Sequence, residues 1–322
     1  MPEMKKKVNF ARMTTTEFKN FILRQSSFIP TIDQFSAIEA FTKLMASREP
    51  TAMILRGSAG TGKTSIVSVM VRSLLALRQK VVLLAPTGRA AKVLSLNCDY
   101  PASTIHRKIY RQKSIGGDFS LDVNMHTDTL FVVDEASMIS TIPQMQTDGM
   151  PAFNGNGGGV IDDLITYVYS GRNCKMLLVG DTAQLPPVGE EEAPALSNAV
   201  IGCYGLKVVD ADLNEVVRQA EESGILWNAT LVRQLITHDD VTQLPRLYFK
   251  AFADIMVLPG NKLIETLEES YASVGIDDTV VITRSNKRAN IYNNGIRTRI
   301  LDYEEELCGG DRIMIVKNHY FN

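Results

Sequence analysis

Cysteine is scarce in this sequence, and the four that occur, Cys98, Cys174, Cys203 and Cys308, lie far apart. The absence of any Cys-x-x-Cys pair or Cys/His cluster argues against structural zinc and a disulfide framework, and favours a reducing compartment. No stretch approaches the roughly 18 uncharged apolar residues that a membrane span needs. The basic residues near the start are followed by further charges rather than an apolar segment, which argues against a secretory signal. We therefore expect a cytoplasmic protein without membrane contact.

Charge of one sign is also lacking, because 34 Lys and Arg oppose 36 Asp and Glu for a net charge of −2. A nucleic-acid partner is therefore not visible in the bulk charge and has to be sought in local clusters. The composition, 45% hydrophobic and 22% charged, is that of an ordinary globular protein. A chain of 322 residues is too long for a single hydrophobic core of ordinary size, which predicts two domains.

Short apolar segments alternate with helical ones through the first two thirds of the chain. An amphipathic helix over residues 14–25 and a second helix with Thr31 as its N-cap are expected first. The expected strands are residues 52–55, 81–85, 130–133 and 176–179, and the expected helices 63–77 and 88–96. Because these strands show no polar alternation, they favour parallel strands covered on both faces, which is an α/β doubly wound sheet.

A second α/β unit is expected after about residue 220. Its predicted helices are residues 225–237, 262–271 and 286–300, and its predicted strands are 255–258 and 280–283. A further strand over residues 311–316 would belong to a different, β-rich insertion.

A glycine-rich turn follows the first predicted strand and opens a helix, which is the context that a P-loop needs. It comprises Gly57, Ser58, Ala59, Gly60, Thr61, Gly62, Lys63 and Thr64, and matches GxxxxGK[ST]. Its glycines let backbone N–H groups turn toward phosphate oxygens, and the helix N-terminus adds a favourable potential. The pattern predicts that Lys63 reaches the β- and γ-phosphates and that Thr64 ligates Mg²⁺.

Polar residues also follow two later strands. Asp134 and Glu135 come directly after residues 130–133, where a carboxylate can hold Mg²⁺ and its neighbour can deprotonate a water molecule. Gln184 lies in the loop after residues 176–179, at the edge where doubly wound sheets bind ligands, and could contact the γ-phosphate. A prolyl turn capped by Asp181 is the alternative interpretation of that loop.

Six segments together resemble the superfamily 1B DNA helicases of the RecD/Dda group, which includes proteins like the exodeoxyribonuclease V α-subunit. They are GSAGTGKT (57–64), APTGRAAKVL (85–94), STIHR (103–107), VVDEASMI (132–139), LLVGDTAQLPPVG (177–189) and LNEVVRQ (213–219). The resemblance runs from about residue 28 to the end. It implies a RecA-like P-loop NTPase fold and an ATP- and Mg²⁺-dependent helicase or translocase moving 5′→3′ on single-stranded or forked duplex DNA.

The resemblance also implies roles for single residues. Gln34 would read the adenine, Gln184 would couple ATP to DNA, and Arg218 would reach the γ-phosphate as a catalytic residue beside Lys63 and Glu135. The alternatives are a polar residue at a helix start for Gln34, and a surface ion pair with Glu215 or Glu221 for Arg218.

Basic residues are concentrated in two clusters that could line a groove for single-stranded DNA. The first is Arg89, Lys92, Arg107, Lys108, Arg111 and Lys113, and the second is Arg284, Lys287, Arg288, Arg297 and Arg299. A solvated helix face is the alternative for either. In the family, the segments that match Thr87, Arg89, Lys92, Thr104, His106, Arg284 and Asn286 contact DNA. A hairpin around residues 116–118 would carry Phe119 to the strand junction, or be an ordinary surface hairpin.

The expected domains are an N-terminal helix (1–30), a RecA-like motor domain 1A (31–220) with a small 1B hairpin at about 107–128, a partial second RecA-like domain 2A (221–301), and the start of an SH3-like insertion (302–322). The family's motifs V and VI do not follow, so the resemblance implies an N-terminal fragment with impaired activity. Two other functions remain open: a nucleotide- and DNA-binding module for protein partners in repair or recombination, and a P-loop kinase. The kinase is disfavoured by the segments DEAS and GDTAQLPP.

Overall fold

The computed structural model describes residues 10, 13–112, 119–143, 158–215, 223–237, 244–250 and 252–313. The chain divides into two compact units. Unit 1 comprises residues 1–221 and 229–245, and unit 2 comprises residues 222–228 and 246–322. Among the described residues, none of the helices combines the length and the apolar character that crossing a membrane requires.

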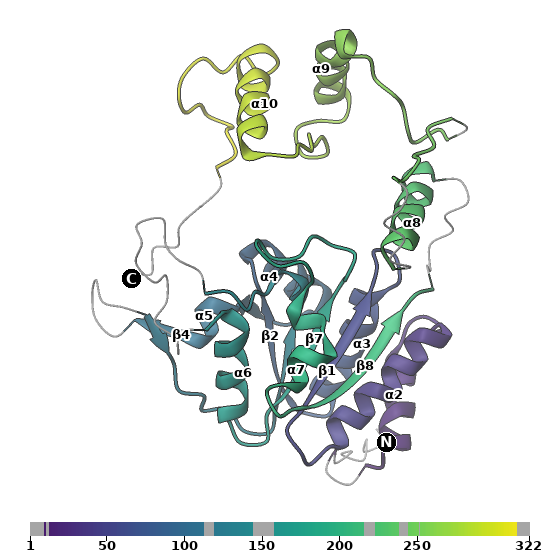
Figure 1. Cartoon of the computed structure of the whole chain (residues 1–322), viewed down its shortest axis with the longest axis vertical. Helices are drawn as coiled ribbons and strands as arrows, with labels where there is room; N and C mark the ends of the chain where they lie inside the picture. Colours follow the sequence, from purple (N-terminus) through teal and green to yellow (C-terminus); the bar gives the residue numbers. More distant parts are fainter. Residues whose placement is uncertain are drawn as a thin grey trace, which may run out of the picture. The chain divides into compact units, whose positions relative to one another are not determined.

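Unit 1 is built on a six-stranded sheet in the order β3-β2-β6-β7-β1-β8, in which every neighbouring pair is parallel (Figure 1). The strands are β1 (Thr51–Gly57), β2 (Lys80–Ala85), β3 (Ala102–Thr104), β6 (Thr129–Val133), β7 (Lys175–Gly180) and β8 (Lys207–Leu213). The four central strands, β1, β2, β6 and β7, are those that the sequence predicts. Because all six strands are parallel, their carboxyl ends share one edge of the sheet.

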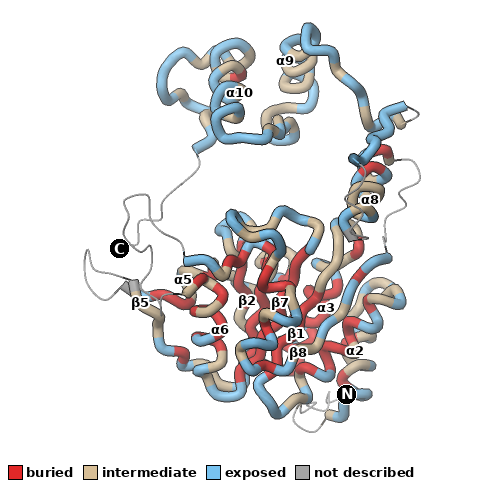
Figure 2. The backbone as a smooth tube through the Cα atoms, in the orientation of Figure 1, coloured by how far each residue is buried: buried red, intermediate tan, exposed pale blue. Residues whose placement is uncertain are grey.

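Successive side chains of the central strands enter two separate cores. In β1, Met53 and Leu55 join one buried cluster, while Ala52 and Ile54 join the other. The first cluster is covered by α1 (Thr15–Gln25), α2 (Ile32–Ala46), α3 (Lys63–Ala76) and α4 (Gly88–Cys98). The second is covered by α5 (Ile105–Ile109), α6 (Val160–Ser170) and α7 (Asn198–Gly202). The strands are the most continuously buried part of the unit (Figure 2), and the expected doubly wound sheet is confirmed.

The predicted hairpin is present as an antiparallel pair. Strand β4 (Tyr110–Gln112) pairs with β5 (Phe119–Leu121) in the register Gln112 to Phe119. The turn at residues 116–118 and the side chain of Phe119 lie outside the described residues.

Unit 2 contains the start of α8 (Gly224–Thr237), then α9 (Leu263–Ser273) and α10 (Asn286–Arg299), close to the predicted helices. The predicted strands at 255–258 and 280–283 are wrong, because neither segment forms a strand. Their apolar side chains are largely exposed, from Val257 at 65% to Ile282 at 90%. A strand exists only with a ladder partner, and the described residues of unit 2 offer none. The strand predicted at 311–316 is absent from residues 311–313, and the rest of it lies outside the described residues.

Candidate functional site

The P-loop joins the end of β1 to the start of α3, at the carboxyl edge of the sheet. Gly60 and Gly62 adopt φ angles of 85° and 83°, a left-handed conformation that glycine tolerates without steric cost. At Gly57, a Cβ atom would lie 2.8 Å from the Cβ of Leu213 and 2.9 Å from Oγ1 of Thr61. Thr61 Oγ1 also donates to the carbonyl of Ser58 at 2.8 Å. The loop is therefore a tight turn that the hydroxyl of Thr61 closes, and its three glycine positions suit glycine better than any larger residue.

Lys63 is folded inward over this turn. Its Nζ donates to the carbonyl oxygen of Gly57 and lies 4.0 Å from Oδ2 of Asp181. Burial lowers the pKa of Lys63, while the carboxylates of Asp181, Glu135 and Asp134 act in the opposite direction. The ammonium group is thus partly removed from water and surrounded by acceptors, which suits a cation that must hold an anionic ligand.

Asp134 and Glu135 extend from the end of β6. The N–H of Asp134 donates to the carbonyl of Leu84 at 3.0 Å, which continues the ladder to β2 beyond the last residue of β6. Burial raises the pKa of Asp134, opposed by the N–H of Glu135, which donates to Oδ1 of Asp134 at 3.0 Å. Glu135 has a φ of 52°, an uncommon left-handed conformation for a residue other than glycine. The backbone turns sharply at the residue that the sequence assigns as the base.

Gln184 is tied to the segment after β6. Ser137 Oγ donates to Oε1 of Gln184 at 3.1 Å, and Gln184 N donates to the carbonyl of Asp181 at 3.2 Å. The ends of β6 and β7 approach closely here, because a Cβ at Gly180 would lie 3.0 Å from the backbone nitrogen of Ser137. The structure therefore brings Lys63, Asp134, Glu135 and the loop that carries Gln184 to one place.

The first turn of α2 anchors two parts of this site. Gln34 is 2% exposed, and its Nε2 donates to the carbonyl of Thr61 at 3.0 Å while its Oε1 accepts from Thr31 N at 3.2 Å. Beside it, Oδ2 of Asp33 accepts from the N–H groups of Asn214 and Glu215, at 2.7 and 3.1 Å. Nothing in the sequence marks Asp33 for this contact, since an acidic residue at a helix start has an ordinary local explanation. Arg218, a few residues further on, lies outside the described residues.

Replacing Gln34 by alanine should weaken the binding of ATP and of inorganic triphosphate to the same extent, by roughly 10-fold, since the unsatisfied Thr61 carbonyl costs about 1–3 kcal/mol. Calorimetry with both ligands measures the two affinities. If ATP binding alone weakens, the amide reads the adenine instead of anchoring the loop. Ser36→Ala, on the exposed face of the same helix, is the control.

A polar pocket of about 230 Å³ begins at Thr64 and was not foreseen from the sequence. It is lined by Ser27, Phe28, Thr64, Ser65, Ser68, Val69, Arg72 and Asn97. Arg72 Nη2 donates to the carbonyl of Asn97 at 2.7 Å and so joins α3 to the end of α4. Because Thr64 belongs to both the P-loop and this pocket, a ligand with its phosphates on the loop has a neighbouring pocket for its remaining part.

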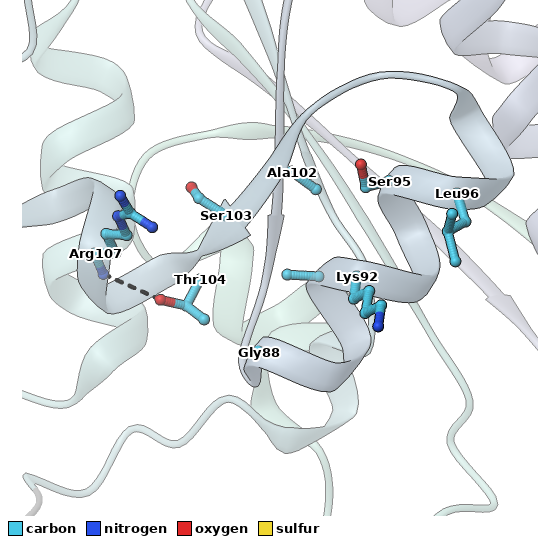
Figure 3. A pocket seen from close by; sticks show the side chains of 9 residues that line it. Gly88, Lys92, Ser95, Leu96, Ala102, Ser103, Thr104 and Arg107 are labelled. Atoms are coloured by element: carbon cyan, nitrogen blue, oxygen red, sulfur yellow. Dashed lines mark hydrogen bonds between the residues drawn. The ribbon is translucent and has the colours of Figure 1, made fainter. Parts of the chain in front are cut away.

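A groove of about 320 Å³ lies between α4 and the segment of β3 and α5 (Figure 3). It is lined by Gly88, Ala91, Lys92, Ser95, Leu96, Ala102, Ser103, Thr104 and Arg107. Thr104 caps α5 by accepting from the N–H of Arg107 at 3.3 Å, the dashed line in Figure 3, and Thr87 caps α4 in the same way. Three residues predicted to contact DNA or supply basic charge, Lys92, Thr104 and Arg107, therefore meet in one groove.

The other predicted DNA contacts are not in this groove. Arg89 is exposed on the first turn of α4. The ring of His106 lies 5.6 Å from that of Tyr110 at an interplanar angle of 39°, and burial lowers the pKa of His106, which favours the neutral imidazole. Arg284 and Asn286 are exposed in unit 2, at the start of α10.

Parts of this chain are similar to known proteins. Residues 33–147 match the sequence profile of the AAA domain family. Over 178 residues, or 55% of this chain, the sequence is 30% identical to the ATP-dependent RecD2 DNA helicase of Deinococcus radiodurans. The match spans 21% of that relative, about a fifth of its length. In the crystal structure of Saccharomyces cerevisiae RIF2, 80% of the chain aligns with 71% of this chain, at 12% identity and with a TM-score of 0.28.

A parallel six-stranded sheet covered on both faces, with a P-loop after β1 and acidic and amide side chains after β6 and β7, is the fold of a RecA-like P-loop NTPase domain.

Proposed function

We propose that this chain is an ATP-dependent helicase or translocase motor acting on single-stranded DNA. The observation that carries the proposal is the shared edge of the sheet. The nucleotide site follows β1, β6 and β7, and the groove with Lys92 and Arg107 follows β2 and β3. Since the strands are parallel, phosphate chemistry and a basic groove lie at the same side of one rigid core. The partial similarity to a RecD2 DNA helicase supports DNA as the second ligand.

Each residue of the nucleotide site has a proposed role in ATP hydrolysis. Backbone N–H groups of the P-loop and Lys63 bind the phosphates. Thr64 and Asp134 supply the hard oxygen donors that Mg²⁺ prefers, and the bound ion would neutralise phosphate charge. Glu135 accepts the proton of the attacking water, and Gln184 orients that water. The pocket beyond Thr64 would take the nucleoside.

The bond from Ser137 to Gln184 joins the segment after Glu135 to the loop after β7, so these two parts of the nucleotide site would respond together to the phosphates, and Gln184 is proposed to couple ATP to DNA. The proposal extends to 5′→3′ movement, to Arg218 as a second phosphate-contacting cation and to a strand-separating role for the β4–β5 hairpin. It also takes residues 31–220 as motor domain 1A and residues 221–301 as part of a second motor domain, with protein partners in repair or recombination.

ATPase assays with and without single-stranded DNA test the function. A motor hydrolyses ATP faster when DNA is added. DNA binding without turnover would instead indicate a binding module, and phosphate transfer to a small acceptor would indicate a kinase; either result contradicts the proposal.

Affinity for single-stranded DNA should fall steeply with salt, because each neutralised phosphate releases a counterion, with a log–log slope of about −0.7 per contact. Lys92→Ala and Arg107→Ala should each weaken DNA binding and make the log–log slope less steep by the contribution of one phosphate contact, about 0.7. The control is Lys80→Ala, at the amino end of β2 and hydrogen-bonded to Thr127. Fluorescence anisotropy over a salt series measures the slopes, and unchanged slopes in both groove variants would show that DNA does not use this groove.

A further inference from the structure

Three aromatic rings form a cluster in unit 2, which we call the Trp227 cluster: Trp227, Tyr248 and Phe252. The ring of Trp227 meets Tyr248 edge to face, with centroids 4.8 Å apart and planes at 83°. Trp227 also contacts Phe252, with ring centroids 6.1 Å apart and an interplanar angle of 37°. The cluster joins the first turns of α8 (Figure 1) to the segment around residues 246–254.

Polar contacts fix this cluster from both sides. Asn228 donates to the carbonyl of Tyr248 at 2.8 Å and accepts from its N–H at 2.7 Å. The carboxylate of Asp254 accepts from Gly224 N at 2.8 Å and from Ser223 Oγ at 2.7 Å, which caps α8. The ring of Phe252 packs directly on Gly224, where a Cβ would lie 2.5 Å from its Cγ. These contacts set the backbone around the rings before any ligand arrives.

The cluster is nevertheless open to solvent. Trp227 is 39% exposed and Tyr248 is 52% exposed, and the next residue, Phe249, is 44% exposed. Exposed apolar side chains occur elsewhere in unit 2, as at Val257 and Ile282, but the rings of the Trp227 cluster differ because the contacts described above hold them in place, which favours a binding surface.

Two basic residues flank Tyr248 in the sequence. Arg246 and Lys250, each two residues from Tyr248, are fully on the surface. The carboxylate of Asp254, the acidic residue of this segment, accepts hydrogen bonds from the N–H groups of Gly224 and Ile225 at the start of α8. Exposed aromatic rings and two exposed cationic side chains therefore occur together in one short segment.

We propose that the Trp227 cluster stacks an unpaired base of single-stranded nucleic acid, with Arg246 and Lys250 pairing with its phosphates. Every base offers a π-face to such a ring, and the backbone supplies the anions that the two cations attract. A proline-rich peptide also packs on exposed aromatic rings, but it has no anion for Arg246 and Lys250. The inference rests on the proposed function for its ligand class, while its residues are separate from the nucleotide site and the groove.

Trp227 is the single tryptophan of the sequence, so its fluorescence reports on this site alone. Adding a thymidine oligonucleotide should quench the emission, whereas an abasic oligonucleotide of equal length should not. Trp227→Ala should weaken binding of the oligonucleotide roughly 10-fold, and Trp227→Phe should largely restore it, because stacking needs only an aromatic face. Arg246→Ala and Lys250→Ala leave the reporter in place and should shift the quenching curve to higher oligonucleotide concentrations.

Tyr271→Ala, a partly exposed ring of α9 outside the cluster, serves as the matched control. Lys92→Ala separates this proposal from the function proposed above, because it tests the groove without touching the cluster. If anisotropy shows binding that depends on Lys92 while Trp227 emission stays constant, the stacking site is refuted and the groove stands. Quenching that survives in Lys92→Ala supports the cluster even if DNA does not stimulate ATP hydrolysis. Equal quenching by the abasic oligonucleotide, or quenching by a proline-rich peptide alone, overturns the proposal.

Discussion

Replacing Lys63 by alanine is expected to abolish ATP hydrolysis and to weaken ATP binding by about 10- to 100-fold, the equivalent of a lost charge-assisted contact of roughly 1.5–3 kcal/mol. Lys63 is the only basic residue within the P-loop, and its Nζ already points into the turn toward the Gly57 carbonyl. Without it, the carboxylates of Asp134, Glu135 and Asp181 remain at this place and repel an anionic nucleotide, and of the charges that act on Lys63 only Arg233 is a cation.

Calorimetry with a non-hydrolysable ATP analogue measures the affinity, and phosphate release measures turnover. Lys43→Ala, in the last turn of α2, removes a charge of the same type away from the site and should change neither. Thermal melting checks that the Lys63 variant remains folded despite losing its bond to Gly57. Wild-type affinity in a folded Lys63→Ala variant would remove this residue from the site.

Replacing Glu135 by glutamine is expected to leave Mg·ATP binding intact and to reduce hydrolysis by about 10²–10⁴-fold, the usual contribution of a general base. Glutamine has the same size as glutamate and should keep the left-handed backbone conformation of residue 135, but its amide cannot accept a proton. A variant that binds but does not turn over also separates the roles of Glu135 and Asp134, because Asp134→Asn should instead weaken the binding of Mg²⁺, so that a higher Mg²⁺ concentration is needed for the same turnover.

Glu192→Gln is the control for this variant, since it makes the same change at an exposed glutamate in the loop after β7. Single-turnover phosphate release distinguishes chemistry from product release. Wild-type turnover in Glu135→Gln would assign the base to another residue, with Asp181 beside Lys63 the next to test.

The sequence predicted the elements whose signal is local. Central strands such as β1 and β7 are buried on both faces, so their apolar runs reveal them. Strand β8 was missed because it lies at the edge of the sheet and exposes Asp210. In unit 2, the apolar run at 280–283 resembles a strand but has no partner to pair with among the described residues, and pairing is not encoded in the segment itself.

The candidate site divides in the same way. The P-loop and the Asp134–Glu135 pair are contiguous motifs, so their residue types and spacing were sufficient to place them. The contact of Asp33 with Asn214 spans 181 residues, and that of Gln34 with Thr61 spans 27. Contacts between distant residues depend on how the strands are ordered in the sheet, which a single sequence does not specify.

Through the adjacent residues Asp33 and Gln34, the first turn of α2 connects two distant parts of the chain. The side chain of Gln34 is hydrogen-bonded to the P-loop at Thr61, and that of Asp33 is hydrogen-bonded to Asn214, directly after β8. Because both contacts come from consecutive residues of one helical turn, we expect a displacement of the P-loop at Thr61 to shift the chain after β8 as well. A substitution that loosens this turn would uncouple the two rather than damage either alone.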